Sequence, residues 1–193
     1  MRSKMKLYLA TSNPGKIREF SATGLEVELL PAMRDLPLAP EIGDTFEANA
    51  IEKALYYAAH ADSWLIAEDS GLEVDALAGA PGVHSARWAG DDAANNARLV
   101  REMDGRQIRT ARYVCVIALV AKDRVLATFR GTVEGEILQH PRGEGGFGYD
   151  PYFLYKPFAQ TFAEIPKERK TTVSHRGKAI KQLNAWLREN VST

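Results

Sequence analysis

Three carboxylates in the first half of the sequence are of the type that could hold a hard metal ion. Glu68 and Asp69 follow the apolar residues 64–67 and precede a Ser-Gly pair, so a turn could present both carboxylates to a cleft. Glu41 lies earlier, in a segment that contains several prolines. Mg²⁺ is commonly held by one or two carboxylates together with phosphate oxygens and water. These residues suggest a magnesium site, and an acidic surface turn is the alternative.

A second group could bind phosphate, in the run Thr11-Ser12-Asn13-Pro14-Gly15-Lys16. Asn13 is suited to cap a helix and Pro14 to its first position. Free backbone N–H groups and the positive end of the helix dipole would then converge on one point, where Lys16 adds a full charge. The P-loop motif, GxxxxGK followed by Ser or Thr, is absent from the sequence. A well-capped helix with a solvated lysine is the alternative.

The next amphipathic segment offers a further cation. Asn49 and Lys53 are four residues apart, so they share one face of an expected helix whose opposite face is apolar. A lysine in such a helix is most often a solvated charge. Asp44 as N-cap and Glu47 three residues later are expected to form a capping box at the start of this helix.

A glycine-rich loop from Gly143 to Pro151 contains the pattern GxGxxG. A dinucleotide-binding role is excluded because the pattern does not follow a strand and Pro151 prevents an immediate helix. The loop still offers Phe147, whose ring could stack on a base, and the carboxylate of Asp150. A simple turn with Phe147 tucked into the core is the alternative.

A basic segment over residues 167–178 leads into a helix that Ser174 is expected to cap. Lys170 could bind an anion, and His175 and Arg176 could face a ligand. A solvated basic loop is the alternative. The other histidines show no ligand spacing, which argues against zinc; they are His60, His84 and His140.

Hydrophobic patterning places these groups on an α/β framework. Strands are expected over residues 5–10, 26–30, 64–67, 112–121 and 124–133, and helices from residue 13 and over 45–61, 91–103 and 174–190. The last two strands flank a tight turn at Lys122-Asp123 and should form an antiparallel hairpin. The mixture predicts a mixed sheet with flanking helices, in two lobes around a central cleft.

The bulk composition limits the function classes. The chain has 193 residues, and residues 1–193 are expected to form one domain. Its 25 basic and 25 acidic residues balance, so no overall electrostatic field attracts the protein to nucleic acid or to a membrane. The single cysteine, Cys115, lies in an apolar run and is interpreted as a buried small hydrophobe. Without a possible disulfide within the chain, a leader or a membrane-spanning stretch, the expected location is cytoplasmic.

The order of the motifs along the chain resembles the inosine triphosphate pyrophosphatase family. The matching segments are Thr11 to Lys16, Thr45-Phe46 with Asn49-Ala50 and Lys53-Ala54, Glu68 to Leu72, Gly79 to Arg87, Gly146 to Pro151, and Ser174 to Gly177. Together they extend over nearly the whole chain. The resemblance implies an elongated mixed α/β fold with a central cleft, a homodimer, Mg²⁺ as cofactor, and hydrolysis of inosine- and xanthosine-type triphosphates to the monophosphate and pyrophosphate.

The resemblance also implies a role for each matching residue. Asp69 is the expected catalytic base, and Glu41 and Asp69, with Glu68 close by, are the expected metal carboxylates. The triphosphate is expected to contact Thr11, Ser12, Asn13, Pro14, Gly15 and Lys16, together with Lys53. The residues expected to bind the rest of the nucleotide are Ser70, Phe147, Gly148, Tyr149, Asp150, Lys170, His175 and Arg176.

One position departs from the family pattern, because Ala48 stands where a glutamate is usual. If that carboxylate orients a lysine or metal-bound water, Glu47 or Glu52 would have to replace it. Two other functions remain open: a pyrophosphatase that prefers another modified nucleotide, and a nucleotide-binding or RNA-binding module without turnover. The balanced charge and clustered carboxylates argue against RNA.

Overall fold

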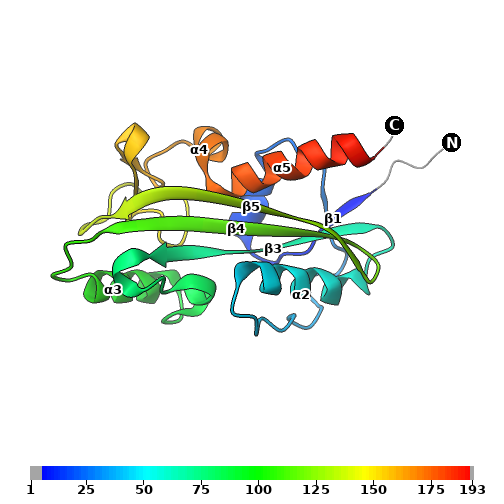
Figure 1. Ribbon diagram of the computed structural model, residues 1–193, viewed down its shortest axis with the longest axis horizontal. Coiled ribbons are helices and arrows are strands. Elements are labelled where there is room, and N and C mark those ends of the chain that lie inside the picture. Colours follow the sequence, from blue (N-terminus) through cyan, green and yellow to red (C-terminus); the bar gives the residue numbers. More distant parts are fainter. Residues whose placement is uncertain (1–5, 192–193) are drawn as a thin grey trace.

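The apolar run around Cys115 forms the centre of the molecule as one arm of a long antiparallel hairpin. Its strands are β4 (Thr110–Ala121) and β5 (Arg124–Ile137), and Ala121 pairs with Arg124 across the predicted turn. β3 (Trp64–Val74) pairs antiparallel with the other side of β4. In this computed structural model, which describes residues 6–191, the three strands run along the long axis of the molecule (Figure 1).

Over residues 6–191 the sheet has seven strands in the order β2-β1-β3-β4-β5-β6-β7. The short members are β1 (Leu7–Leu9), β2 (Glu28–Leu29), β6 (Phe153–Tyr155) and β7 (Gln160–Thr161). β1 lies parallel to β2 and β3, whereas the other pairs are antiparallel, so the predicted mixed sheet is confirmed. Met5, where the first strand was expected to begin, lies outside the described residues.

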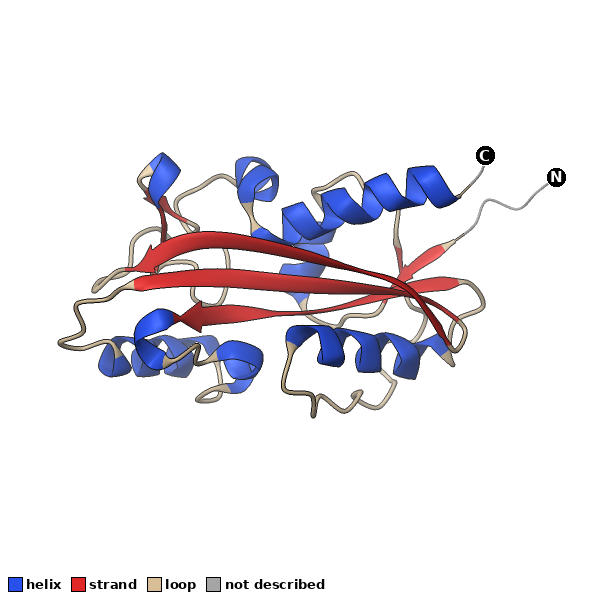
Figure 2. Ribbon diagram, viewed as in Figure 1, coloured by secondary structure: helices blue, strands red, loops and turns tan. Residues whose placement is uncertain are grey.

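Helices cover both faces of the sheet (Figure 2). α2 (Phe46–Ala58) and α3 (Asp92–Glu102) lie on one face, and α1 (Pro14–Ser21), α4 (Lys167–Val173) and α5 (His175–Asn190) lie on the other. Three short 3₁₀ turns complete the structure: η1 (Asp75–Leu77), η2 (Gly82–Arg87) and η3 (Lys156–Phe158). No helix within residues 6–191 is long and apolar enough to cross a membrane.

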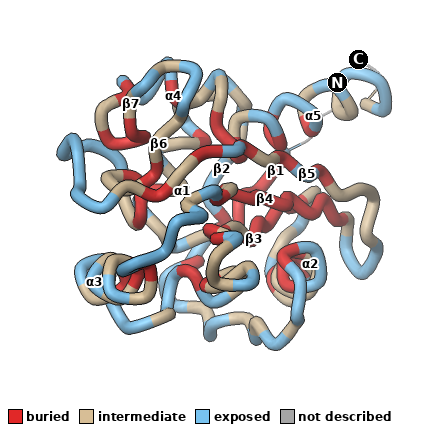
Figure 3. Tube along the Cα trace, turned by 60° about the vertical axis from the view of Figure 1, so that its left-hand side comes forward, coloured by how far each residue is buried: buried red, intermediate tan, exposed pale blue. Residues whose placement is uncertain are grey.

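Strand alternation divides the core between the two faces. Leu65 and Val116 pack in the cluster beneath α2, whereas Ile66 and Cys115 pack in the cluster beneath α5. Cys115 is fully buried, which confirms its predicted place. Burial is concentrated along the central strands (Figure 3), so the long sheet provides a rigid base for the groups at its edges.

Two local predictions were wrong. Thr45, not Asp44, caps α2, because the Thr45 backbone is extended and its hydroxyl oxygen accepts a 3.1 Å hydrogen bond from Ala48 N–H. Glu47 accepts instead from the Thr128 hydroxyl at 2.7 Å, so no capping box forms. The expected turn at residues 68–71 is also absent, since β3 continues to Val74.

Candidate active site

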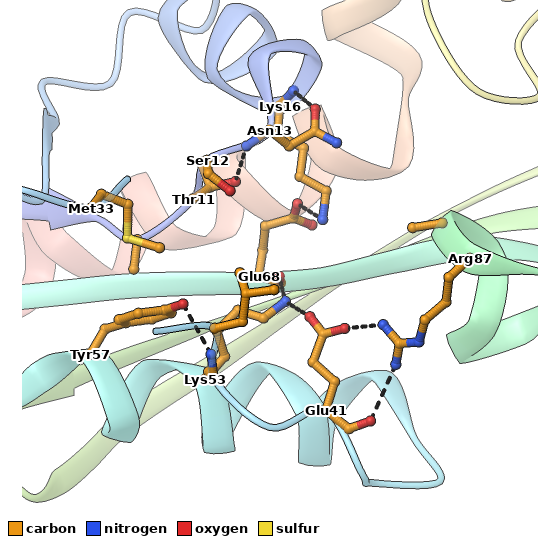
Figure 4. A pocket seen from close by; sticks show the side chains of 14 residues that line it. Thr11, Ser12, Asn13, Lys16, Met33, Glu41, Lys53, Tyr57, Glu68 and Arg87 are labelled. Carbon is orange, nitrogen blue, oxygen red and sulfur yellow. Dashed lines mark hydrogen bonds and ion pairs between the residues drawn. The ribbon is translucent and has the colours of Figure 1, made fainter. Parts of the chain in front are cut away.

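The junction between β1 and α1 has the predicted cap. Asn13 Oδ1 accepts hydrogen bonds from Gly15 N–H at 2.8 Å and from Lys16 N–H at 3.1 Å. These N–H groups are therefore already bonded, contrary to the expectation that they would be free. What the junction offers to phosphate is the Lys16 ammonium, together with the hydroxyls of Thr11 and Ser12, which line the same pocket (Figure 4).

An open strand edge lies beside this junction. β1 pairs with β3 only as far as Ile66, so the next residues of β3 are paired with β4 alone. On this open edge Lys53 Nζ donates to Glu68 O at 3.3 Å. Successive strand residues point to opposite faces, so Glu68 is directed toward α1 and α5 and Asp69 toward α2. Both side chains reach the cleft because no neighbouring strand covers this edge.

Glu68 is a fully buried carboxylate at the centre of an ion-pair network. Its oxygens lie 2.6 Å from Lys16 Nζ and 3.4 Å from an Arg176 nitrogen, and Cys115 Sγ donates to it at 3.3 Å. Burial opposes ionisation, but the charges of Arg176 and Lys16 outweigh it and hold the pKa of Glu68 well below its usual range. Glu68 is therefore an anion that fixes two cations at the cleft.

Asp69 has a different environment. It is 5% exposed and accepts hydrogen bonds from Asn49 Nδ2 at 3.1 Å and from Ser70 N–H at 3.0 Å. Burial raises the pKa of Asp69 above its usual value, although Lys53 and Lys16 partly oppose this. A carboxylate with a raised pKa is a stronger proton acceptor, which suits a general base.

Glu41 is held between two cations. Its carboxylate forms ion pairs with Lys53 and with Arg87, and Arg87 also donates to Glu41 O at 3.2 Å (Figure 4). Burial would raise the pKa of Glu41, but Lys53 and Arg87 lower it overall. Glu41 is therefore ionised, and it lines the same pocket as Asp69.

The donor groups fit a magnesium ion that is shared with substrate. Within residues 6–191, no three His, Cys, Asp or Glu side chains gather closely enough to form a complete metal site. Mg²⁺ does not need one, because it takes one or two carboxylates with phosphate oxygens and water. Glu41 and Asp69 supply such a pair, and each Asp69 oxygen accepts only one hydrogen bond and keeps a lone pair.

The glycine-rich loop brings an aromatic ring to the other end of the cleft. Phe147 is half-buried and lines the second pocket rather than the core. Its ring packs on Gly15, where an added Cβ would lie 2.7 Å from the ring, so only glycine fits there. Tyr149 donates from its hydroxyl to Ser85 O at 2.8 Å, and Asp150 accepts from Phe147 N–H at 3.0 Å. The loop is thereby fixed beside the pocket.

Three residues of the basic segment, Lys170, His175 and Arg176, are buried rather than solvated. Lys170 lies on α4, a helix that was not predicted, and its ammonium is 2.6 Å from Asp150 and 2.8 Å from Glu19. Burial would lower the pKa of Lys170, but Asp150 and Glu19 raise it. His175 and Arg176 begin α5, where the Ser174 hydroxyl accepts from Gly177 N–H at 3.1 Å as predicted.

Arg176 connects three elements of the site. Its guanidinium forms ion pairs with Glu19 and Glu68 and donates to Ser70 Oγ at 2.8 Å. His175 stacks on Tyr113 with ring centroids 4.7 Å apart. Burial holds the pKa of His175 well below its usual value, so the imidazole is neutral. Among the described residues, His175 Nδ1 and Arg176 Nε are buried polar atoms without a partner, and both residues line the second pocket.

Two pockets adjoin each other and share part of their lining. The first is lined by Thr11, Ser12, Lys16 and Lys53, and the second by Asp69, Ser70, the residues of the glycine-rich loop, Lys170, His175 and Arg176. Both are bordered by Asn13, Lys16, Glu41, Ala86 and Arg87. Most of the sequence-predicted site residues therefore line these two pockets, but Pro14 and Gly15 line neither of them. Both pockets contain cations, and Phe147 belongs to the second.

Some residues of the site were not predicted. Glu19 on α1 was not singled out from the sequence, and it pairs with both Lys170 and Arg176. Tyr113 and Asp92 also line the second pocket. Glu47 and Glu52, which were considered as replacements for the glutamate missing at position 48, line neither pocket.

Comparison with known proteins agrees with the family indicated by the motifs. A dITP/XTP pyrophosphatase from an Exiguobacterium species is 48% identical over 190 residues, which is 95% of this chain and 97% of its own length. The structure of the Staphylococcus aureus Ham1 protein matches with a TM-score of 0.84 and 39% identity, covering 95% of this chain and 98% of that one. A nucleoside-triphosphatase / dITP/XTP pyrophosphatase from Mycobacterium abscessus matches with a TM-score of 0.72 and 40% identity, covering 93% and 98%.

The match to a family model extends from residue 7 to residue 186. It therefore includes Asp69 and the residues that line both pockets. The chain belongs to the Ham1 family.

Proposed function

We propose that this protein is a Mg²⁺-dependent pyrophosphatase that hydrolyses dITP, ITP and XTP to the monophosphate and pyrophosphate. The observation that carries the proposal is the pair of adjoining pockets: Lys16 and Lys53 line the first with the hydroxyls of Thr11 and Ser12, and Asp69 and Phe147 line the second. A nucleoside triphosphate has the same order of chemistry, with anionic phosphates at one end and a flat base at the other. The dITP/XTP pyrophosphatases among the relatives support the same substrate class.

At the phosphate end, Lys16 and Lys53 neutralise the triphosphate while Thr11 and Ser12 donate hydrogen bonds. Glu41 and Asp69 would hold Mg²⁺, with Glu68 close by. Bound by these residues, the ion would supply positive charge to the phosphates. Glu68 keeps Lys16 and Arg176 in place through its ion pairs.

The reaction is an attack of water on the α-phosphorus. Asp69 accepts the proton of the water, whose oxygen bonds to the α-phosphorus. The bond from the α-phosphorus to the bridging oxygen breaks, and that oxygen leaves with the electron pair as part of pyrophosphate. The raised pKa of Asp69 strengthens it as the acceptor, and Asn49 holds its orientation.

At the base end, Phe147 provides a stacking surface, and buried polar atoms read the base edge. Inosine and xanthosine carry an acceptor oxygen at C6, where adenine carries an amino donor. Arg176 can only donate hydrogen bonds, and its Nε has no protein partner. A site built on such a polar match rejects the mismatched base by up to roughly 10⁴–10⁵. This argument distinguishes inosine from adenine but not from guanine, which shares the C6 oxygen.

The wider proposal is that the protein removes deaminated purine nucleotides before a polymerase can incorporate them. It acts in the cytoplasm as a homodimer of single-domain chains, each with two lobes around the cleft. Its partner is the nucleotide substrate rather than nucleic acid or a membrane, in agreement with its balanced charge.

Product analysis in ¹⁸O-labelled water tests the reaction. We expect dITP and Mg²⁺ to yield dIMP and pyrophosphate, with the label in dIMP because water attacks the α-phosphorus. Formation of dIDP and phosphate would contradict the proposal. Absence of turnover with dITP, ITP and XTP, despite tight binding, would favour a binding module, and faster turnover of another modified nucleotide would change the assigned substrate.

A further inference from the structure

Arg87 is a half-exposed arginine at the junction of the two pockets. Its side chain is 48% exposed, and it extends from the end of η2 to the carboxylate and the backbone oxygen of Glu41 (Figure 4). Glu41 also pairs with Lys53. Glu41 therefore retains a cationic partner if Arg87 turns away from it.

The position of Arg87 between the two pockets indicates which group of the substrate it would contact. Arg87 borders both pockets, whereas Lys53 borders only the phosphate end. A ligand with its base in one pocket and its terminal phosphates in the other must cross this junction. In a nucleoside triphosphate the group between the nucleoside and the pyrophosphate is the α-phosphate, so the junction is the place for the reacting phosphorus.

Two cations border both pockets, Lys16 and Arg87. Lys16 is tied at 2.6 Å to Glu68, which is fully buried and would lose a partner if Lys16 moved. Arg87 has no such restriction, because its partner Glu41 is partly exposed and has a second cation. Arg87 is therefore the cation that can turn toward a phosphate at this point.

The backbone that carries Arg87 is fixed relative to Asp69. Ser85 Oγ accepts from Leu72 N–H at 2.8 Å and donates to Gly82 O at 2.6 Å, which attaches η2 to β3. The contact is close, since a Cβ on Gly71 would lie 2.3 Å from Ser85 Oγ. A backbone held by hydrogen bonds, together with a side chain that is half exposed, allows the guanidinium to exchange partners.

We propose that Arg87 is a catalytic residue that binds the α-phosphate of the substrate. This inference rests on the proposed function. The guanidinium leaves Glu41 and donates to non-bridging oxygens of the α-phosphate. It stabilises the charge there while the water oxygen bonds to the α-phosphorus and pyrophosphate departs with the electron pair of the broken bond.

Binding of substrate fragments tests the contact without turnover. IMP carries only the α-phosphate, inosine carries none, and pyrophosphate represents the β and γ groups. We expect Arg87→Ala to weaken IMP binding by about tenfold to a hundredfold, the usual value of a charge-assisted hydrogen bond, and to leave inosine and pyrophosphate nearly unchanged. Lys53→Ala is the matched control, since it removes the other partner of Glu41. Lys53→Ala should lower the affinity for pyrophosphate more than the affinity for IMP.

Kinetics separate a catalytic contact from a structural one. We expect Arg87→Ala to lower kcat for dITP by roughly 10²–10³ with a smaller change in KM, and Arg87→Lys to restore part of kcat because it returns the charge but not the planar fork. Equal weakening of IMP and inosine, or unchanged IMP binding, would overturn the assignment. The wild-type product analysis distinguishes this outcome from failure of the proposed function, because it does not depend on Arg87.

Discussion

The Asn49 side chain joins Asp69 to the loop that carries Glu41. Its Nδ2 donates to Asp69 Oδ2 at 3.1 Å, and its Oδ1 accepts from Gly43 N–H at 2.8 Å. The first hydrogen bond stabilises the ionised form of Asp69 and so lowers the Asp69 pKa. We expect Asn49→Ala to raise that pKa further and to shift the acid limb of the kcat/KM profile to higher pH.

Tyr57→Phe is the matched control for this prediction. The Tyr57 hydroxyl accepts from Ala39 N–H at 3.1 Å and donates to Pro37 O at 3.2 Å, so it holds the same loop without contacting Asp69. The acid limb should not move in this variant. A limb that moves equally in both variants would assign the effect to the loop.

Asp69→Asn tests the general base directly. The amide is nearly isosteric with the carboxylate but cannot accept the proton, so we expect a folded protein whose turnover of dITP is lower by roughly 10²–10⁴. Asp123→Asn, in the exposed β4–β5 turn, serves as the control and should retain turnover. Near wild-type turnover in a folded Asp69→Asn protein would remove Asp69 from this role.

Lys16→Ala tests the phosphate end. ITP carries a triphosphate and inosine does not. The substitution should therefore lower the affinity for ITP by at least about tenfold and change the affinity for inosine little. Calorimetry in an Asp69→Asn background avoids consumption of ITP. Lys6→Ala removes a lysine that pairs only with the exposed Glu28 among the described residues, and it should change neither affinity. Similar weakening of both ligands would show that Lys16 acts through Glu68 rather than through phosphate.

The local features of the site could be predicted from the sequence because neighbouring residues determine them. Asn13 caps α1 through N–H groups two and three residues away, and the β4–β5 hairpin closes at the expected turn. Phe46 and the alanines at four-residue intervals form the buried side of α2. Family membership also followed from the order of short motifs.

The features that were missed depend on residues far apart in the chain. Glu68 and Asp69 looked like the end of a strand because two acids rarely continue a buried one. They do continue it, since Arg176, 108 residues away, neutralises Glu68. Glu19 lies 157 residues from Arg176 and had no local signal of burial. Such pairings follow from the packing of α1 and α5 on one face, which periodicity does not specify.

Two side chains of α3 hold the glycine-rich loop that carries Phe147. Asp92 Oδ2 accepts from Gly148 N–H at 2.8 Å, and Asn96 Nδ2 donates to Gly148 O at 2.9 Å. Without them the loop carrying Phe147 would lose order, which substrate binding would have to restore. We expect Asn96→Ala to raise KM for dITP about fivefold with little change in kcat, and Asp92→Ala to act likewise. Asp92→Asn keeps an acceptor oxygen and should be close to wild type. A change confined to kcat would contradict this role.

The pairing of Glu19 with Lys170 and Arg176 should make stability depend on acid pH. Burial opposes ionisation of Glu19, but Arg176 and Lys170 outweigh it and lower the pKa of Glu19 from 4.5 to about 2. A carboxyl whose pKa is lower in the folded state stabilises the fold at pH values above its unfolded pKa, and this contribution is lost as pH falls through the folded value. The pKa of Glu68 is lowered in the same direction.

We therefore expect the urea midpoint of the wild type to fall steeply between about pH 4.5 and pH 2. Glu19→Gln should be less stable at pH 7 and lose less of its remaining stability over that interval, whereas Glu189→Gln, on the exposed end of α5, should follow the wild type. Parallel curves for wild type and Glu19→Gln would show that the pair contributes no acid-dependent stability.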